Sequence, residues 1–148
     1  MTELSHVDRE GRVRMVDVGA KPLSRRRATA AARVRMARET AARLRELPKG
    51  DALTAAELAG VMAAKRTSEL IPLCHSLPLS HVQVVAEVRD DAVEISASVD
   101  TVAQTGVEME ALVAASVAAL TVYDMAKAVD AGMVVETVRL VEKTKEPV

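Results

Sequence analysis

Aromatic residues are almost absent from the sequence, which has 148 residues, one Tyr, no Phe and no Trp. A core must therefore be built from Ala, Val, Leu, Ile and Met, which suits close packing of helices on a sheet. The scarcity also removes the stacked rings on which proteins hold single-stranded nucleic acid. The composition, 49% hydrophobic and 28% charged, is typical of a globular chain. At this length we expect a single domain over residues 1–148.

Cysteine and long apolar runs are also scarce. Cys74 is the only cysteine, so it cannot form an internal disulfide and fits a reducing compartment. The longest uncharged helical stretch, residues 111–123, is shorter than the ~20 residues that span a bilayer. Charged residues interrupt any apolar run at the N-terminus, namely Glu3, Asp8, Arg9 and Glu10. We therefore expect a soluble cytoplasmic protein with no membrane partner.

The two halves of the chain differ in charge although the net charge is only −1. Residues 1–50 carry 13 Lys or Arg against 6 acids, and residues 51–148 carry 7 against 15. A basic half beside an acidic half could bind a phosphorylated ligand, or it could pair two copies of the chain.

Hydrophobic spacing predicts the elements of the first half. Val13–Val18 alternates and is expected to form a strand. Ser24 is then the expected N-cap of a long arginine-rich helix that ends before Pro48 and Gly50. Apolar residues recur within it at helical spacing, namely Ala30, Val34, Ala37, Ala41 and Leu44. A shorter helix should follow, with Thr54 and Glu57 at the spacing of a capping box.

The second half predicts a loop, a hairpin, a helix and a strand. Pro72 and Pro78 exclude a regular helix between residues 71 and 78. Residues 81–88 and 93–102 have β character and form the hairpin. A helix from Thr105, capped with Glu108, should run to about residue 130, and a last strand should cover residues 133–141. This order predicts an α+β fold, a ferredoxin-like antiparallel sheet with helices packed on one face.

The reactive side chains match no standard motif. There is no glycine-rich phosphate loop, no Walker sequence and no zinc signature, and adjacent Cys74 and His75 are too few for a metal site. What remains are Lys, Asp, Glu and His, which serve as general acids and bases and as phosphate partners. Plainer explanations stay open. Glu108 could only complete its capping box, Asp124 and Lys127 could be a surface ion pair, and Cys74 could be a small buried hydrophobe.

One distance limits any site that uses both ends of the last predicted helix. Glu110 and Asp124 are fourteen residues apart, hence ~21 Å apart along a helix axis. Both cannot touch one reacting centre from the same chain. Small residues on this helix would let another backbone approach closely, namely Ala111, Ala114, Ala115, Ala118 and Ala119. Together with the charge split, this favours a site shared between subunits.

Several blocks of the sequence, in order over almost the whole chain, carry a resemblance to one family. The blocks are Met15–Val18 with Lys21, Lys49–Asp51, Ala63–Thr67, Leu70–His75, Thr105–Leu112, Ala114–Thr121, Tyr123–Met125 and Lys127–Val129. In these the chain resembles the cyclic pyranopterin monophosphate synthase family, the molybdenum-cofactor biosynthesis protein C group. It departs from the pattern at Ser76 and in its unusually arginine-rich segment.

The resemblance implies a lyase of molybdenum cofactor (molybdopterin) biosynthesis. Its substrate would be (8S)-3′,8-cyclo-7,8-dihydroguanosine 5′-triphosphate, and its products cyclic pyranopterin monophosphate, a pterin, and diphosphate. The chemistry would be acid–base catalysis without a redox cofactor, and Mg²⁺ could accompany the triphosphate.

The resemblance also implies roles for individual residues. Asp124, Lys127 and Lys49 match the catalytic positions. Substrate-binding positions match Leu73, Cys74, His75, Met109, Glu110 and Glu108, and also Arg26 and Lys65. The resemblance also implies a homo-oligomer. The expected assembly is a hexamer built as a trimer of dimers, with active sites at the dimer interface.

Two rival hypotheses remain. The first is a nucleic-acid-binding module that uses the basic helix, against which stand the missing aromatic residues and a sequence pI of 6.3. The second is an inactive relative that serves as a subunit, against which stands the intact set of predicted acid–base residues.

Overall fold

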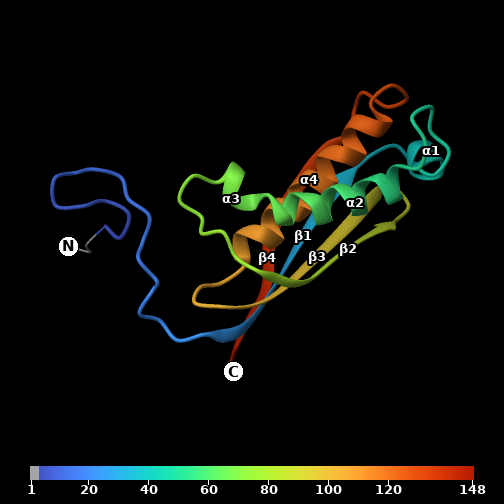
Figure 1. Ribbon diagram of the computed structural model, residues 1–148. Coiled ribbons are helices and arrows are strands. Elements are labelled where there is room, and N and C mark those ends of the chain that lie inside the picture. Colours follow the sequence, from blue (N-terminus) through green and yellow to red (C-terminus); the bar gives the residue numbers. More distant parts are fainter. Residues whose placement is uncertain (1–3) are drawn as a thin grey trace.

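The computed structural model describes residues 4–148 (Figure 1). Its elements are β1 (Ser24–Arg35), α1 (Arg38–Ala41), α2 (Ala52–Lys65), α3 (Thr67–Leu70), β2 (Leu79–Val88), β3 (Ala92–Ala103), α4 (Glu108–Ala126) and β4 (Val134–Pro147). The strands form one antiparallel sheet in the order β2-β3-β1-β4, and α2 and α4 lie on one of its faces. This is the split βαβ order of ferredoxin-like folds, so the predicted fold class is confirmed.

The predicted long helix from Ser24 is wrong, because residues 24–35 form the strand β1. Ala28, Ala30, Ala32 and Val34 point to the helix layer and are buried, whereas the residues between them face the opposite side. Ala and Arg are strong helix formers, and this hid the two-residue period. Pairing with β3 on one side and β4 on the other outweighs that local preference. Only α1 is helical in the rest of the segment.

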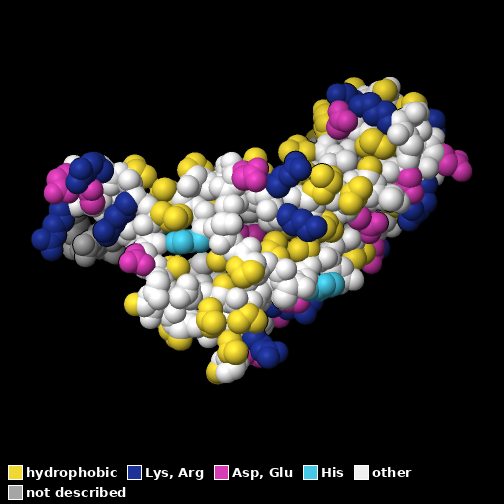
Figure 2. Space-filling view, in the orientation of Figure 1, with side chains coloured by type: hydrophobic (Ala, Val, Ile, Leu, Met, Phe, Trp, Pro, Cys, Tyr) yellow, Lys and Arg dark blue, Asp and Glu magenta, His cyan; other side chains and the backbone are white. Residues whose placement is uncertain are grey.

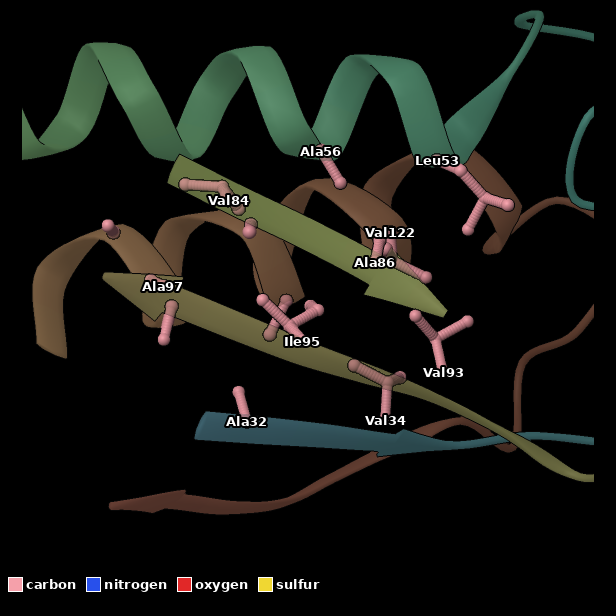
Figure 3. Close-up of a cluster of buried hydrophobic side chains, with 14 of the residues drawn as sticks. Ala32, Val34, Leu53, Ala56, Val84, Ala86, Val93, Ile95, Ala97 and Val122 are labelled. Carbon is pink, nitrogen blue, oxygen red and sulfur yellow. The ribbon is translucent and has the colours of Figure 1, made fainter. Parts of the chain in front are cut away.

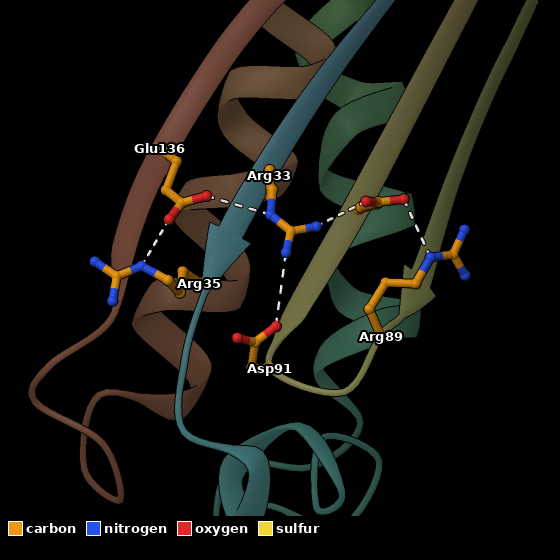
Figure 4. A network of polar contacts seen from close by, with 6 residues as sticks. Arg33, Arg35, Arg89, Asp91 and Glu136 are labelled. Carbon is orange, nitrogen blue, oxygen red and sulfur yellow. Dashed lines mark hydrogen bonds and ion pairs between the residues drawn. The ribbon is translucent and has the colours of Figure 1, made fainter.

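The arginines of β1 explain the charge split of the sequence. Arg33 contacts Glu94 of β3 at 2.7 Å and Glu136 of β4 at 3.2 Å, and Arg35 contacts Glu136 at 2.6 Å (Figure 4). The acids of the second half thus neutralise arginines of the first half within one chain. The basic helix required by the nucleic-acid hypothesis does not exist in this structure.

Three smaller predictions about element starts are also wrong. Val13–Val18 forms no strand, and only an isolated bridge joins Val7 to Val13. Asp51 rather than Thr54 caps α2, and Glu57 instead accepts a hydrogen bond from the backbone of β2. α4 begins at Glu108 without a side-chain cap from Thr105. Each of these predictions rested on a local sequence pattern alone. Such a pattern does not include the other residues that decide whether a strand forms or which residue caps a helix.

The remaining elements are confirmed, with longer or shorter bounds than predicted. Residues 71–78 form no regular element, and β2 and β3 form the expected hairpin. α4 ends at Ala126, four residues before the predicted end, and β4 continues six residues beyond residue 141. The single-domain prediction for residues 1–148 stays a prediction, and its first three residues lie outside the described part.

The core lies between the sheet and the helix layer (Figure 3). Its largest members are aliphatic, among them Val34, Val93 and Ile95 from the sheet and Val122 from α4. Gly60 of α2 lets that helix approach α4, since a Cβ there would lie 3.1 Å from the carbonyl oxygen of Ala114. The alanines of α4 expected to meet another subunit are fully buried inside this chain, namely Ala111, Ala114, Ala115, Ala118 and Ala119. They therefore no longer favour a shared site.

α4 is also the one described helix that is long and apolar enough to cross a membrane by length and composition. Half of its apolar window is buried inside the chain, between the sheet and α2, as in the core helix of many folded domains.

Candidate active site

The predicted catalytic residues lie together at the C-terminal end of α4. Asp124 Oδ1 contacts Lys127 Nζ at 2.9 Å, and its Oδ2 accepts a hydrogen bond from Lys49 Nζ at 3.0 Å. Lys49 also reaches the carbonyl oxygen of Asp124 at 3.3 Å. One carboxylate thus orients two ammonium groups that come from segments 75 residues apart.

A tight turn delivers Lys49 to this cluster. Leu47 and Gly50 exchange two backbone hydrogen bonds across residues 47–50, and Gly50 has a φ of 114°, where side chains are strained. The next residue, Asp51, accepts bonds from the amides of Leu53 and Thr54 and so caps α2. The turn is therefore anchored directly to the start of a helix, which fixes where Lys49 emerges.

The two ammonium groups hold the pKa of Asp124 below its usual range, first through the hydrogen bond from Lys127 and then through that from Lys49. Asp124 is therefore ionised at neutral pH. All three side chains are about half exposed, at 45% for Lys49, 56% for Asp124 and 55% for Lys127. In a single chain this cluster has acid–base groups but lies open to solvent.

A pocket of about 530 Å³ lies at the other end of α4. Six predicted substrate-binding residues line it, namely Leu73, Cys74, His75, Glu108, Met109 and Glu110. The loop over residues 71–77 and the start of α4 form two of its walls, and the N-terminal arm, residues 4–23, forms the third. In the space-filling view a histidine is visible at the junction of the arm and the body (Figure 2).

Glu110 is the buried acid of this pocket, with only 3% of its surface exposed. Its Oε2 accepts a weak hydrogen bond from Cys74 Sγ at 3.7 Å, and its Oε1 has no partner among the described residues. Burial raises the pKa of Glu110. Burial and the neighbouring Glu110 also raise the pKa of the Cys74 thiol to about 11, so Cys74 is not a thiolate nucleophile at neutral pH.

His75 ties the pocket to the N-terminal arm. Its Nε2 donates to the carbonyl oxygen of Val16 at 2.6 Å. Because a carbonyl oxygen can only accept a hydrogen bond, Nε2 carries a proton in this contact. Lys21 lines the same pocket from the arm. It stood in a recognised block of the sequence, but the pattern gave no reason to assign it to the site.

Arg26 and Lys65 do not line this pocket. Arg26 lies at the start of β1, where its guanidinium donates to the carbonyl oxygen of Gln104 at 3.4 Å and its Nε is buried without a partner among the described residues. Lys65 lies at the end of α2 beside a separate recess of about 400 Å³ against β2. Within one chain, the predicted site residues therefore lie in several separate locations.

The two main clusters cannot meet within one chain. Glu110 and Asp124 occupy opposite ends of α4, and a fourteen-residue separation in a helix corresponds to ~21 Å. A nucleotide-sized ligand would have to contact one cluster or the other. Among residues 4–148, no three His, Cys, Asp or Glu side chains lie close enough together to hold a metal ion.

Comparison with known proteins gives a single family. The model of the MoaC family matches residues 15–146. A protein named cyclic pyranopterin monophosphate synthase from Thermomicrobium roseum is 55% identical over 97% of this chain and 89% of its own length. Proteins of the same name from Roseiflexus sp. and Peptoclostridium acidaminophilum are 55% and 49% identical, over 97% and 96% of this chain and 94% and 92% of their own lengths.

These matches cover both clusters of the candidate site and every strand of the sheet. The chain therefore belongs to the MoaC family.

Proposed function

We propose that this chain is a lyase that converts (8S)-3′,8-cyclo-7,8-dihydroguanosine 5′-triphosphate to cyclic pyranopterin monophosphate, with release of diphosphate, in molybdenum cofactor biosynthesis. Membership of the MoaC family and the names of three relatives support the reaction. The reaction opens the five-membered purine ring, closes a pyrazine ring and joins the remaining phosphate into a cyclic ester. It needs proton transfers and stabilisation of phosphate charge, and the chain supplies groups for both.

The contact of Lys49 and Lys127 with the single carboxylate of Asp124 is the observation that carries this proposal. Two ammonium groups held side by side can protonate leaving nitrogens and neutralise phosphate oxygens in turn. Asp124 keeps them oriented and remains ionised beside them. We assign Lys49 and Lys127 as the proton donors and Asp124 as the group that holds them in place.

The pocket at the start of α4 is suited to the guanine-derived ring. The unpartnered Oε1 of Glu110 can accept a hydrogen bond from a ring N–H or amino group, which would relieve the cost of a buried polar atom. Nδ1 of His75 can accept a second hydrogen bond or a proton. No resident redox cofactor is part of this proposal, and any Mg²⁺ would arrive with the triphosphate.

The proposed site is assembled from two subunits, with the Lys49–Asp124–Lys127 cluster of one chain facing the Glu110 pocket of another. The length of α4 requires this if both clusters act on one substrate. The open, half-exposed cluster of Lys49, Asp124 and Lys127 would then be covered by the partner. We further propose a hexamer, a trimer of such dimers, that works in the cytoplasm.

The test is to incubate the purified full chain with the cyclic dihydro-GTP derivative and to identify products by liquid chromatography and mass spectrometry. A Lys127→Ala variant and an Arg43→Gln control, which removes an exposed charge outside the site, are measured alongside. Wild type and the control should form diphosphate and the cyclic-phosphate pterin. Lys127→Ala should be slower by about 10²- to 10⁴-fold, the usual contribution of a general acid. Unchanged substrate with folded wild type would refute the proposal.

A further inference from the structure

The two lysines of the cluster at the end of α4 come from two separate segments of the chain. Lys127 is the C-terminal cap of α4 and belongs to residues 124–133, here called the Lys127 segment. Lys49 belongs to residues 37–50, here called the Lys49 segment, which begins at α1. Figure 1 shows α1 and the loop after α4 side by side, at the end of the molecule away from the N-terminal arm. Lys49 and Asp124 join the segments through an exposed ion pair, which by itself fixes the geometry of two segments only weakly.

Asp130 supplies a second connection between the same segments. Its Oδ2 accepts hydrogen bonds from the backbone amide of Ala37 at 3.0 Å and from the hydroxyl of Thr40 at 2.9 Å. Its Oδ1 accepts a hydrogen bond from the amide of Gly132 at 2.9 Å, which closes the turn in its own segment. Thr40 is buried, with 4% of its surface exposed. Within residues 4–148, hydrogen bonds join the two segments only at Asp130 and at Lys49.

Consecutive hydrogen-bonded turns connect Thr40 to Lys49. The amide of Arg43 donates to the carbonyl oxygen of Thr40 at 3.0 Å, and the amide of Glu46 donates to that of Arg43 at 2.9 Å. The turn over residues 47–50 follows directly and carries Lys49. Because these turns leave little freedom between the two residues, a displacement of Thr40 also displaces Lys49.

Asp130 is connected as closely to Lys127. The amides of Val129 and Asp130 both donate to the carbonyl oxygen of Ala126, at 3.0 and 3.1 Å, in the tight turn that ends α4. Ala126 is fully buried, so this turn is fixed to the core. Hydrogen bonds, first that from Ala37, hold the pKa of Asp130 below its usual range, and the carboxylate is therefore ionised at neutral pH. Hydrogen bonds to an ionised carboxylate are stronger than those between neutral groups.

We propose that Asp130 is a positioning residue for the reaction, which sets the distance between Lys49 and Lys127 through its contact with Thr40. This inference rests on the proposed function, in which both lysines donate protons. No sequence pattern assigned Asp130 or Thr40 to the site. Without their contact the two segments would move independently, and the proton donors would meet the substrate less often in a productive arrangement. Asp130 acts through the two segments rather than on the reacting atoms.

Steady-state kinetics of four variants test this role. Asp130→Ala and Thr40→Val each remove the contact between the segments, whereas Asp130→Asn and Thr40→Ser keep an acceptor oxygen or a donor hydroxyl for it. The first pair should lower kcat by about 10- to 100-fold, since a misplacement of about 1 Å can cost about 10²-fold. KM should change by less than about twofold, because the pocket that holds the ring is untouched. The second pair should keep most of the wild-type kcat.

Two further variants separate positioning from a general loss of stability. Glu39→Ala removes an exposed acid from α1 and should keep both kinetic constants. The double variant of Asp130→Ala and Thr40→Val should be no slower than Asp130→Ala alone, because both changes remove the same contact. Circular dichroism establishes that each variant is folded. If Asp130→Ala is not folded, Thr40→Val, which keeps the volume of its side chain, decides the test.

Amine labelling of the free protein separates this inference from the proposed function. An acylating reagent modifies lysines, and mass spectrometry of peptides follows each one. Lys49 should be labelled faster in Asp130→Ala and Thr40→Val than in wild type, because it is held less firmly on Asp124, whereas Lys65 at the end of α2 should be labelled equally in all three. This result supports the positioning role even if wild type fails to turn over the cyclic nucleotide.

Two results would overturn the inference. Wild-type turnover with unchanged kcat in both Asp130→Ala and Thr40→Val would exclude the positioning role and leave the proposed function standing. In a wild-type protein that does not turn over the cyclic nucleotide, equal labelling of Lys49 in all three proteins would exclude it as well.

Discussion

At the scale of single residues, the carboxyl group of Glu110 is the most unusual feature of the chain. It is almost fully buried in a pocket, and Oε1 has no partner among the described residues. A core acid selected only for stability would normally have both oxygens bonded. The arrangement suits a ligand-binding group, whose unmet hydrogen bond is made when the substrate arrives. It should therefore cost stability in the free protein.

We predict that Glu110→Gln stabilises the free protein at neutral pH. Burial raises the pKa of Glu110, so the folded state binds this proton more tightly than the unfolded chain. The group therefore favours folding below the pKa of an unfolded glutamate, and this contribution is lost as pH rises through the raised folded value. Thermal unfolding should show a higher Tm for Glu110→Gln at pH 7 and a smaller difference at pH 4.

The control for this prediction is Glu69→Gln, an exposed acid at the end of α3. It should change Tm little at either pH. An equal effect of Glu110→Gln at both pH values would mean that the charge of Glu110 is not the cause.

At the scale of elements, the approach of α2 to α4 depends on Gly60. A Cβ at this position would lie 3.0 Å from the Val84 side chain and 3.1 Å from the carbonyl oxygen of Ala114. We predict that Gly60→Val lowers the free energy of unfolding by about 1–3 kcal/mol through overpacking, measured by urea denaturation. Leu58→Val, on the exposed side of the same helix, should cost less than about 0.5 kcal/mol. A loss no larger than that of Leu58→Val would contradict the close approach.

The cap of α2 offers a second prediction at this scale. Asp51 accepts hydrogen bonds from the backbone amides of Leu53 and Thr54, and it also contacts Arg45 at 2.9 Å. Asp51→Ala should lower the free energy of unfolding by about 1 kcal/mol, the usual value of an N-cap. It should also slow turnover, because the turn that carries Lys49 is anchored at this residue. Thr54→Ala should cost less in both measurements. Larger losses of stability and turnover for Thr54→Ala than for Asp51→Ala would mean that Thr54 is the cap, as the sequence pattern indicated.

The sequence predicted the fold class and the order of elements, but it placed the first strand in the wrong segment. The hairpin and the last helix were predictable because their periods are clear and their ends carry turn residues. β1 was not, because Ala and Arg favour helices and the strand is decided by pairing with β3 and β4. The capping-box prediction for α2 was also wrong. The cap is Asp51, three residues before the predicted Thr54.

For the candidate site, residue types and the resemblance predicted which groups take part, and that assignment stays a prediction. The fold shows which of these groups lie together. The ion pair between Asp124 and Lys127 follows from helical spacing alone. The approach of Lys49 depends on a turn 75 residues away, and nothing local encodes it.

At the scale of the whole molecule, α4 separates the two clusters of the candidate site. Its first turn contributes Glu108, Met109 and Glu110 to the pocket, and its last turn contributes Asp124 to the cluster with the two lysines. Under the proposed function, a single chain has the proposed ring-binding pocket at one end of α4 and the proposed proton donors, Lys49 and Lys127, at the other. Two chains arranged around a twofold axis would each complete the other, and would make two equal sites per dimer.

Mixing two inactive variants tests this claim most directly. Lys127→Ala and Glu110→Ala chains are co-expressed with different tags, the mixed oligomer is purified through both tags, and turnover is measured by mass spectrometry. A mixed dimer contains one site with both wild-type halves and one site with neither. A random equal mixture should therefore recover about one quarter of the wild-type rate, and hexamers purified through both tags should recover about the same because their dimers still form at random; only dimers that each contain both chains should recover about one half. A rate no higher than the mean of the two parent variants would contradict a site built from two chains.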